Sequence, residues 1–416
     1  MGKHVIVIGG GVMGLNCAYF LHKKGHQVTV LDKSAMDGGA SYVNAGYLTP
    51  SHIIPLASPG MMAKGIKWMF NSSSPFYMKP RLDREFLKWA WRFHKSSTPE
   101  KVERAIPLIA EMNVLSKELY AEMHESGDLG DFQLVTEGLL MLFKSSKAGQ
   151  EEREVMMRAR DLDLQARELS LEELVVLQPG LSPEIKGAIH YQCDAHTTPG
   201  QVMNKMKAYL LRAGVDLHTG TEVTDFTRVG NRLTEVKTRE NSYKADEVVL
   251  AAGSWSPLLS AKLDLKLSLE AGKGYRIDIR RPTPVTLPAI LMEAKVAVTP
   301  MDGFTRLAGT MEFSGINHNV RKNRVAAIAR LAERYYEGFK VRPEEEAQAA
   351  CGLRPVSPDG LPYIGRVKHW QNLSLATGHA MMGWSLGPVT GKLIAELISD
   401  QPTSMSLKDL HPERRF

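Results

Sequence analysis

Residues 5–14 read VIVIGGGVMG, and residues 27–32 read QVTVLD. The apolar, β-branched run at the start predicts a strand buried on both faces of a parallel sheet. The glycines that follow fit G-x-G-x-x-G, and a helical pattern then continues to Gly25, which ends it. A second strand over 27–31 ends on Asp32. Strand, glycine turn, helix, strand and terminal acid in one short unit predict a dinucleotide-binding α/β fold.

Each position of this motif has a physical role. Gly9 permits the tight turn that leaves the strand, and Gly11 lets a pyrophosphate lie against the backbone. Gly14 lets the helix pack closely on the strand, and the helix N-terminus offers its free N–H groups to the phosphates. Asp32 is placed to accept hydrogen bonds from both ribose hydroxyls. The motif by itself does not decide between NAD and FAD.

A second glycine-rich turn lies near the C-terminus. Residues 373–377 (LSLAT) predict a strand, residues 378–384 (GHAMMGW) predict a turn, and a helix is expected to begin near Gly387 and Pro388. A reduced flavin is anionic near N1 and C2=O, so a helix N-terminus aimed there stabilises it. A nicotinamide dehydrogenase has no need of this element. The pair of turns therefore favours FAD over NAD.

The composition is that of a globular protein with a large core. Of 416 residues, 43% are hydrophobic and 24% charged, and the three cysteines lack the paired spacing of a disulfide framework or a zinc site. We recognise no signal peptide and no run of about 18 apolar residues, so we expect a cytoplasmic protein, with association at the inner face of the membrane as an extension of that expectation. The net charge of +6 favours anionic partners, although a basic protein without such a partner is the simpler reading.

Residues 50–97 alternate apolar and aromatic side chains with cations. Trp68, Trp89 and Trp91 are interleaved there with methionines, lysines and arginines. This pattern fits an interfacial patch that touches a membrane surface. It equally fits helices that pack inward while their Lys and Arg side chains reach solvent. No dense basic block with interleaved aromatic residues lies near the termini, so we expect no nucleic-acid partner.

The remaining segments predict two domains built from separate pieces of the chain. Residues 1–50, 195–260 and 346–416 are expected to form a discontinuous, Rossmann-type FAD-binding domain. Residues 51–194 and 261–345 are expected to form a second, α+β substrate domain on a mainly antiparallel sheet.

Several elements of the substrate domain can be assigned from their periodicity. Amphipathic helices are expected over 99–125 and 150–173, on either side of a strand pair at 132–135 and 138–143. A further long amphipathic helix is expected from about Arg324 to Phe339.

These segments together resemble the FAD-dependent amine oxidoreductases of the D-amino-acid oxidase and glycine oxidase superfamily. Within it, the D-amino acid dehydrogenases of the small-subunit type are the nearest pattern. The resemblance spans nearly the whole chain and is most specific at residues 352–365 and 377–391. It implies FAD as cofactor and implies contacts from the following residues: Gly9, Gly11, Val12, Met13, Gly14, Asp32, Lys33, Ser41, Asn44, Ala45, Gly46, Val223, Ala252, Gly253, Gly352, Gly383, Trp384, Ser385 and Leu386.

The activity that the resemblance implies is oxidative deamination of D-amino acids. A hydride passes from the substrate Cα to FAD, and the imino acid hydrolyses to a 2-oxo acid and ammonia, with a quinone or other electron acceptor completing the cycle. Residues 192–198 (QCDAHTT) depart from the dehydrogenase pattern. D-proline or hydroxy-D-proline dehydrogenases and glycine or sarcosine oxidases therefore remain alternatives, as do a flavin-dependent hydroxy-acid dehydrogenase and a non-catalytic flavoprotein.

Two residues are expected to bind the substrate. The Gly-Leu-Arg-Pro setting of Arg354 resembles that of the substrate-binding Arg in glycine oxidases, and a planar guanidinium can hold a carboxylate by two parallel hydrogen bonds. Tyr275 is the expected partner. The alternative role for Arg354 is a structural pairing with Asp359, in which case Arg276 or Arg306 would be the anchor.

Overall fold

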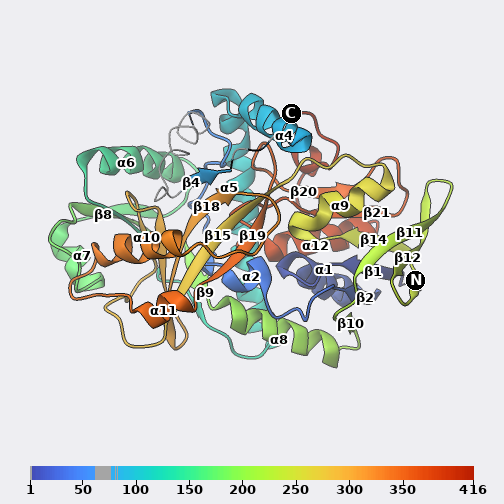
Figure 1. The fold of residues 1–416 in the computed structure, drawn as a ribbon, viewed down its shortest axis with the longest axis horizontal. Coiled ribbons are helices and arrows are strands. Elements are labelled where there is room, and N and C mark those ends of the chain that lie inside the picture. Colours follow the sequence, from blue (N-terminus) through green and yellow to red (C-terminus); the bar gives the residue numbers. More distant parts are fainter. Residues whose placement is uncertain (1, 61–75, 80, 82) are drawn as a thin grey trace.

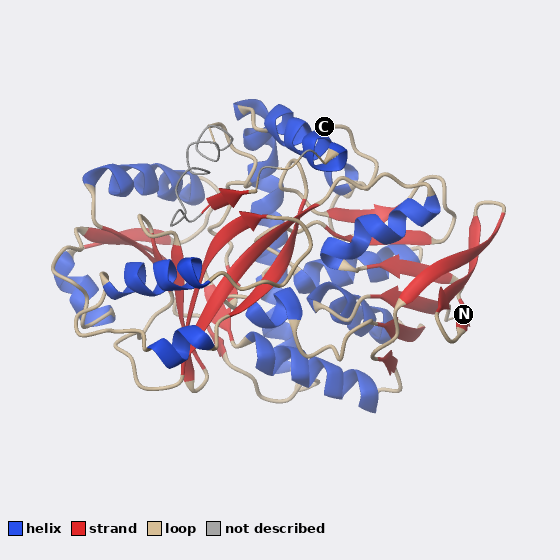
Figure 2. Cartoon of the chain, in the orientation of Figure 1, coloured by secondary structure: helices blue, strands red, loops and turns tan. Residues whose placement is uncertain are grey.

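The computed structural model describes residues 2–60, 76–79, 81 and 83–416 and places two large sheets side by side among helices (Figure 1, Figure 2). One sheet has six strands in the order β10-β2-β1-β14-β21-β20. The other has nine strands, in the order β19-β15-β18-β17-β16-β6-β8-β7 with β4 paired to β18. This is the expected combination of a Rossmann-type sheet with a second, mainly antiparallel sheet.

The six-stranded sheet is parallel except for its edge strand β20, which is antiparallel to β21. Val5 and Val7 of β1 belong to the core cluster on the helical side of the sheet, whereas Ile6 and Ile8 belong to the cluster on its other face. The strand is apolar throughout because both faces are buried. The bounds are β1 (His4–Ile8), β2 (Gln27–Leu31), β10 (Asp216–His218), β14 (Glu247–Leu250), β20 (Tyr363–Arg366) and β21 (Leu373–Thr377).

Helices cover one face of this sheet, and a three-stranded antiparallel sheet covers the other. A Cβ atom on Gly391 would lie 2.5 Å from the Asn16 carbonyl oxygen, so glycine there lets α12 pack closely against α1. The helices are α1 (Val12–Lys23), α5 (Pro99–Glu125), α8 (Pro199–Arg212) and α12 (Gly387–Ile398), and the strands are β11 (Val223–Val229), β12 (Arg232–Thr238) and β13 (Ser242–Lys244).

The nine-stranded sheet is antiparallel apart from the pairs β16·β6 and β18·β4. Helix α10 (Lys322–Glu333) packs on one of its faces through Val325 and Ile328. The strands are β4 (Phe76–Met78), β6 (Leu139–Phe143), β7 (Ala166–Leu169), β8 (Gly187–Tyr191), β15 (Glu270–Ile279), β16 (Ala289–Leu291), β17 (Val296–Met301), β18 (Phe304–Phe313) and β19 (Ala350–Val356).

The small sheet and helix α2 lie between the two large sheets, and the other remaining helices lie around them. A small sheet pairs β9 with both β3 and β5, and Figure 1 shows α2 beside β19, between the two halves of the molecule. The bounds are β3 (Tyr47–Leu48), β5 (Leu134–Val135), β9 (Ala195–Thr197), α2 (Gly39–Val43), α4 (Arg84–Ser96), α6 (Ser146–Arg160), α7 (Leu171–Leu177), α9 (Ser256–Ser260) and α11 (Pro343–Ala347).

The helix predicted over 99–125 is confirmed, since Thr98 caps it and Pro99 begins it. Three other predictions are wrong in detail. The expected strand pair does not form, because β5 pairs with β9 while β6 pairs with β8 and β16. The helix predicted over 150–173 is interrupted by β7, and the one predicted to reach Phe339 ends at Glu333.

The predicted domain boundaries stay a prediction. All six strands of the parallel sheet come from residues 1–50, 195–260 and 346–416. Strand β19, from the last of these segments, pairs with β15 in the other sheet. Helix α5, assigned to the substrate domain, contributes Ile109 and Met112 to the same core cluster as α1 and α12.

The stretch 50–97 is described only in part, and residues 61–75 lie outside the described residues. In α4, Phe86, Trp89 and Phe93 are buried, while Leu87 and Trp91 are exposed at 51% and 60%. Inward packing and an exposed aromatic face therefore coexist on one helix. Among the residues described, no helix is long and apolar enough to cross a membrane.

Candidate cofactor and substrate site

The glycine turn between β1 and α1 has the geometry that its sequence predicts. Gly9 has φ +111, and a Cβ atom on it would lie 2.5 Å from the Ala251 carbonyl oxygen at the end of β14. A Cβ atom on Gly14 would overlap the Gly9 carbonyl oxygen. A Cβ atom on Gly11 would meet nothing closer than the Ser41 hydroxyl, at 3.4 Å. Gly9 and Gly14 thus permit close packing, whereas the space beside Gly11 is open to a ligand.

The N-terminus of α1 keeps hydrogen-bond donors free. Gly11 is the N-cap and has no side chain, and the Val12 N–H donates to the Ser41 hydroxyl at 2.9 Å. The N–H groups of Met13 and Gly14 donate to no other described residue. These donors and the positive end of the helix dipole suit a pyrophosphate.

Asp32 is fixed at the end of β2 by the glycine turn itself. One carboxylate oxygen accepts the Gly10 N–H at 2.6 Å, and the other accepts the N–H and hydroxyl of Ser34, both at 2.7 Å. A carboxylate has about four acceptor positions, so capacity remains for a ribose hydroxyl. The Lys33 ammonium lies 3.8 Å from the centre of the Trp255 ring, and its desolvation lowers its pKa.

Three further expected cofactor residues flank this turn. Val223 begins β11, and the preceding segment is tied to Asp32 because the Thr221 N–H donates to the Asp32 carbonyl at 2.7 Å. Ala252 and Gly253 follow β14, next to Gly9. They lie at the carboxyl edge of the sheet, where ligands of open α/β sheets bind.

Residues 41–46 cross between the two sheets and are held by their backbone. Gly46 has φ +79, and its carbonyl accepts the Thr197 N–H at 2.8 Å. The Ala45 carbonyl accepts the Thr299 hydroxyl at 2.8 Å, and the Asn44 carbonyl accepts an Arg306 N–H at 2.7 Å. These bonds from β9, β17 and β18 fix the segment without using the Ser41 side chain.

Arg306 and Arg276 both donate hydrogen bonds to the Asp278 carboxylate. The Arg306 guanidinium forms two hydrogen bonds to the Asp278 carboxylate, at 2.8 and 3.0 Å, and it also donates to the carbonyls of Tyr42 and Asn44. Arg276 donates to the same carboxylate at 2.6 Å. Arg306 therefore holds the segment 41–46 in place.

Arg354 differs from these two arginines because no carboxylate of the described residues pairs with it. Its one hydrogen bond within the described part of the chain runs to the Thr310 carbonyl at 2.9 Å. Burial lowers its pKa to about 10, which leaves it charged at neutral pH. The alternative pairing with Asp359 is wrong, because Arg414 holds that carboxylate at 2.7 and 2.8 Å.

Tyr275 does not lie where it was expected. Residues directly opposite in a ladder share a face, and β15 pairs Gly272 with Arg354 but Tyr275 with Cys351. The Tyr275 side chain therefore points away from Arg354, is fully buried, and donates to Glu312 at 2.8 Å. The expected pairing of Tyr275 with Arg354 needs correction, because a one-residue step along a strand reverses the face.

Gly352 and the turn before α12 complete the predicted set. A Cβ atom on Gly352 would lie 2.7 Å from the Ala40 Cα, so glycine lets β19 approach α2. The Trp384 indole N–H donates to Thr197 at 2.8 Å, and the Ser385 hydroxyl donates to Asn113 at 2.6 Å.

The side chains of Trp384 and Ser385 are thus engaged inside the protein. The backbone N–H groups of Gly383, Trp384 and Ser385 donate to no described residue. Leu386 is the N-cap of α12. The turn can therefore serve a cofactor through its backbone.

Sequence reasoning missed Gly274 and Thr310. A Cβ atom on Gly274 would overlap the Arg354 guanidinium, and Thr310 supplies the carbonyl that holds it. A sequence signal was present for Gly274, which directly precedes the alternating run 275–279 (YRIDI), because a glycine in or beside a strand often marks close approach of another group. Thr310 carried no signal, because threonine is an ordinary strand residue.

Comparison with known proteins shows the family of the chain. The family model "FAD dependent oxidoreductase" (DAO) matches residues 4–397. A D-amino acid dehydrogenase of Helicobacter pylori is 31% identical over 402 residues, which are 96% of each chain.

Two solved structures share the fold. Glycine oxidase of Geobacillus kaustophilus has a TM-score of 0.79 at 22% identity, with 100% of both chains covered. L-alpha-glycerophosphate oxidase of Mycoplasma pneumoniae, solved with FAD bound, has a TM-score of 0.73 at 17% identity, with 96% of this chain and 95% of that chain covered. The open space beside Gly11, the free donors at both helix N-termini and the position of Asp32 fit FAD. The chain belongs to the DAO family of FAD-dependent oxidoreductases.

Proposed function

We propose that this chain is a D-amino acid dehydrogenase that deaminates its substrate oxidatively. The observation that carries the proposal is Arg354, a charged side chain without a carboxylate partner among the described residues, on a strand that touches the cofactor-side helix α2. The similarity to the Helicobacter pylori D-amino acid dehydrogenase supports this substrate class. A partly buried cation without a carboxylate partner carries a desolvation cost that an anionic ligand would offset.

FAD would be held by the two helix N-termini and by Asp32. The N–H groups of Met13 and Gly14 would bind the pyrophosphate, and those of Gly383 to Ser385 would bind the pyrimidine end of the flavin. When bound, FAD supplies the acceptor for the hydride that leaves the substrate Cα. The remaining predicted contacts, including Val223, Gly253 and Lys33, belong to the same proposal.

Arg354 would act on the substrate through its charge and its planar shape. Two parallel N–H groups would hold the carboxylate and thereby fix the direction of the Cα–H bond. As that bond breaks, the amine nitrogen becomes an imine and loses a proton to solvent. Water then adds to the imine, and ammonia leaves to give the 2-oxo acid. No strong base is required of the protein.

We propose a quinone or another non-oxygen acceptor for the electrons, and a peripheral contact with the cytoplasmic face of a membrane. The support is the exposed face of α4, where Leu87 and Trp91 lie one helical turn apart among Arg84, Lys88 and Lys95. Lys95 lies 5.0 Å from the Trp91 ring centre. Apolar and cationic groups on one exposed face suit an anionic interface.

The test is anaerobic mixing of the purified holoenzyme with a panel of D- and L-amino acids while the flavin absorbance is followed. We expect D-amino acids to bleach the flavin and their L-enantiomers to leave it oxidised. A colourless protein that depends on NAD would refute the cofactor assignment. Bleaching by L-amino acids, or by glycine or sarcosine in preference to all D-amino acids, would refute the substrate class. Rapid hydrogen peroxide formation without a dye would make the protein an oxidase.

A further inference from the structure

The position of Arg354 depends on an irregularity in the pairing of β15 with β18. Lys273 pairs with Glu312, but two residues later Tyr275 pairs with Gly309, so β18 contains one extra residue at this point. Such an insertion is a β-bulge, which bends a strand and re-aims the groups on it. Thr310 lies in the bulge, and its carbonyl accepts the Arg354 N–H at 2.9 Å.

Thr310 has a backbone conformation that a β-branched residue rarely adopts. Its φ is +70, in the left-handed region where glycine is favoured. Strain of this kind persists only where the surrounding structure enforces it, and it is concentrated at functional sites. Here the strained residue turns its carbonyl toward a guanidinium that has no other hydrogen-bond partner among the described residues.

Gly274 contributes by having no side chain. It lies on β15 opposite the bulge and opposite Gly352 of β19. The nearest atoms to a Cβ built on Gly274 are the two terminal nitrogens and the central carbon of the Arg354 guanidinium, all of which it would overlap. The guanidinium thus lies across the backbone of β15 at this glycine.

We propose that Gly274 and the bulge at Thr310 are the positioning elements that set where Arg354 holds the substrate carboxylate. Gly274 provides the space that the guanidinium occupies, and the Thr310 carbonyl fixes its rotation. One N–H group of the guanidinium is held by the protein, and the remaining donors would bind the substrate carboxylate. This inference rests on the proposed function, because it assumes that Arg354 binds the carboxylate.

The test is a double-mutant cycle between Gly274→Ala and Arg354→Ala in the FAD-loaded protein. The measured quantities are the dissociation constant of D-alanine and the limiting rate of anaerobic flavin reduction. Gly274→Ala must displace the guanidinium by roughly 1 Å, and a misplacement of that size can lower the efficiency of reduction by about 100-fold. In the Arg354→Ala background, the same substitution should have almost no effect, because the group that it displaces is gone.

Gly272→Ala is the matched control. Gly272 lies on the same strand and the same face, but the nearest atoms to a Cβ atom there belong to the side chains of Met311 and Val356, not to the guanidinium. Its effect should be equal with and without Arg354. Additive effects of Gly274→Ala and Arg354→Ala would overturn the proposal and leave Gly274 a packing residue. If Arg354→Ala itself changes neither the dissociation constant nor the rate of flavin reduction, Arg354 does not bind the carboxylate and the proposed function loses its main support.

Thr310→Gly tests the second positioning element. Glycine adopts φ +70 without strain and keeps the carbonyl, so the affinity for D-alanine should change by less than about threefold. A loss as large as that of Gly274→Ala would show that the side chain, and not the carbonyl, positions Arg354. That result would overturn the role assigned to the bulge.

Discussion

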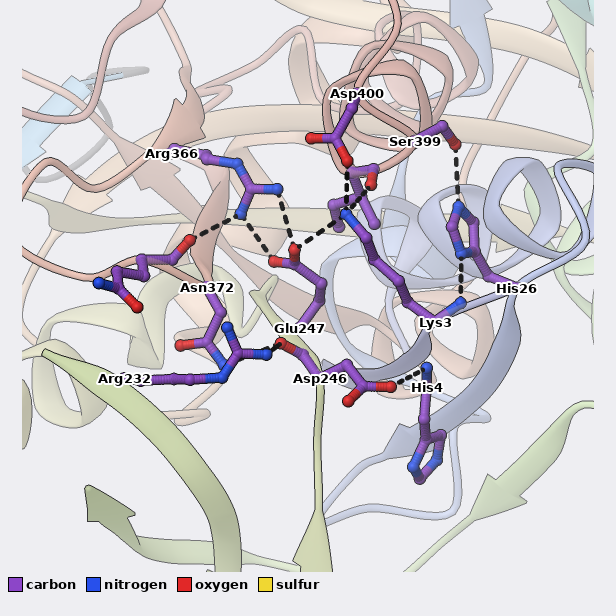
Figure 3. Close-up of polar contacts among 12 residues, drawn as sticks. Lys3, His4, His26, Arg232, Asp246, Glu247, Arg366, Asn372, Ser399 and Asp400 are labelled. Carbon is purple, nitrogen blue, oxygen red and sulfur yellow. Dashed lines mark hydrogen bonds and ion pairs between the residues drawn. The ribbon is translucent and has the colours of Figure 1, made fainter. Parts of the chain in front are cut away.

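Charged groups are paired differently at the two ends of the strands in the six-stranded sheet. We call the end where the parallel strands begin the amino edge, and the end where they finish the carboxyl edge. At the amino edge, drawn in Figure 3, the Glu247 carboxylate accepts hydrogen bonds from Arg366 at 2.7 and 3.0 Å and from Lys3 at 3.4 Å. Lys3 also binds Asp400 at 2.8 Å. At the carboxyl edge, the helix N-terminal N–H groups and the nearby Arg354 have few or no partners among the residues that the structure describes. Complete pairing indicates a structural role, and incomplete pairing indicates a place for a ligand.

Strand β19 brings Arg354 to this open edge. The Ser254 hydroxyl, in the turn that follows β14, donates to the Leu353 carbonyl at 3.2 Å. The two sheets are therefore joined beside the candidate site. If complete pairing marks a structural role and incomplete pairing marks a ligand site, substitutions at the amino edge should alter stability. Substitutions at the carboxyl edge should alter binding and turnover.

The largest expected effect is that of Arg354→Ala. Loss of the cation and its planar donors should lower kcat/KM for D-amino acids by about 100-fold or more, while FAD stays bound. Arg354→Lys keeps the charge but loses the planar pair of donors, so its kcat/KM should lie between those of the wild type and the Ala variant. Steady-state assays with an artificial dye acceptor, together with the flavin spectrum, measure both properties. Near-normal kcat/KM in the Ala variant would rule out the anchor role.

Arg366→Ala is the counterpart at the amino edge. It leaves the buried Glu247 carboxylate with Lys3 alone. Because the Arg366 side chain is 25% exposed, the free energy of unfolding should fall by about 2–3 kcal/mol, less than for a fully buried pair. Turnover per bound flavin should stay unchanged. Urea denaturation and the dye assay on the same preparation separate the two effects. A loss of turnover without a loss of stability would contradict the division between the edges.

Asp194 is a third case, a buried carboxylate that forms no salt bridge among the described residues, although the charge of Lys117 acts on it. It accepts the N–H and hydroxyl of Ser51 at 2.9 and 2.5 Å, and desolvation raises its pKa from 3.8 to about 7. Between pH 4 and 7 the folded state therefore binds a proton that the unfolded state has lost. Stability should fall as the pH rises through this window, by about 1–2 kcal/mol after relaxation.

Asp194→Asn should remove that part of the pH dependence. Thermal unfolding at pH values from 4 to 8 measures it, with Ser51→Ala as a companion that keeps the carboxyl group. An Asn variant whose stability still declines with the wild-type slope would show that another group titrates in this window.

The smallest expected effect is on membrane binding by helix α4, which lies outside both edges of the sheet. Trp91→Ser should weaken binding to anionic phosphatidylglycerol vesicles at low salt by roughly fivefold, because an exposed aromatic anchor is lost. Leu258→Ser, at another exposed apolar side chain, is the matched control and should change nothing. Co-sedimentation measures the bound fraction. Equal binding of the two variants and the wild type would contradict the proposal that α4 contacts a membrane.

Local sequence determined the elements whose stabilising groups are neighbours along the chain. The glycine turn of Gly9 to Gly14, the helix over 99–125 and the turn before Gly387 all form where their residues predict, since each depends on nearby φ values, caps or apolar periodicity. The cofactor class follows from two of these local units.

Tertiary structure alone decided how distant strands meet. Pairing of β15 with β19 sends Tyr275 to the Glu312 face and Arg354 to the opposite one, and pairing with β18 creates the bulge at Thr310. A strand pattern has a period of two, so one residue of register exchanges its faces. Register between segments far apart in the chain is fixed by long-range packing, and it is this packing that leaves Arg354 without a carboxylate partner among the described residues.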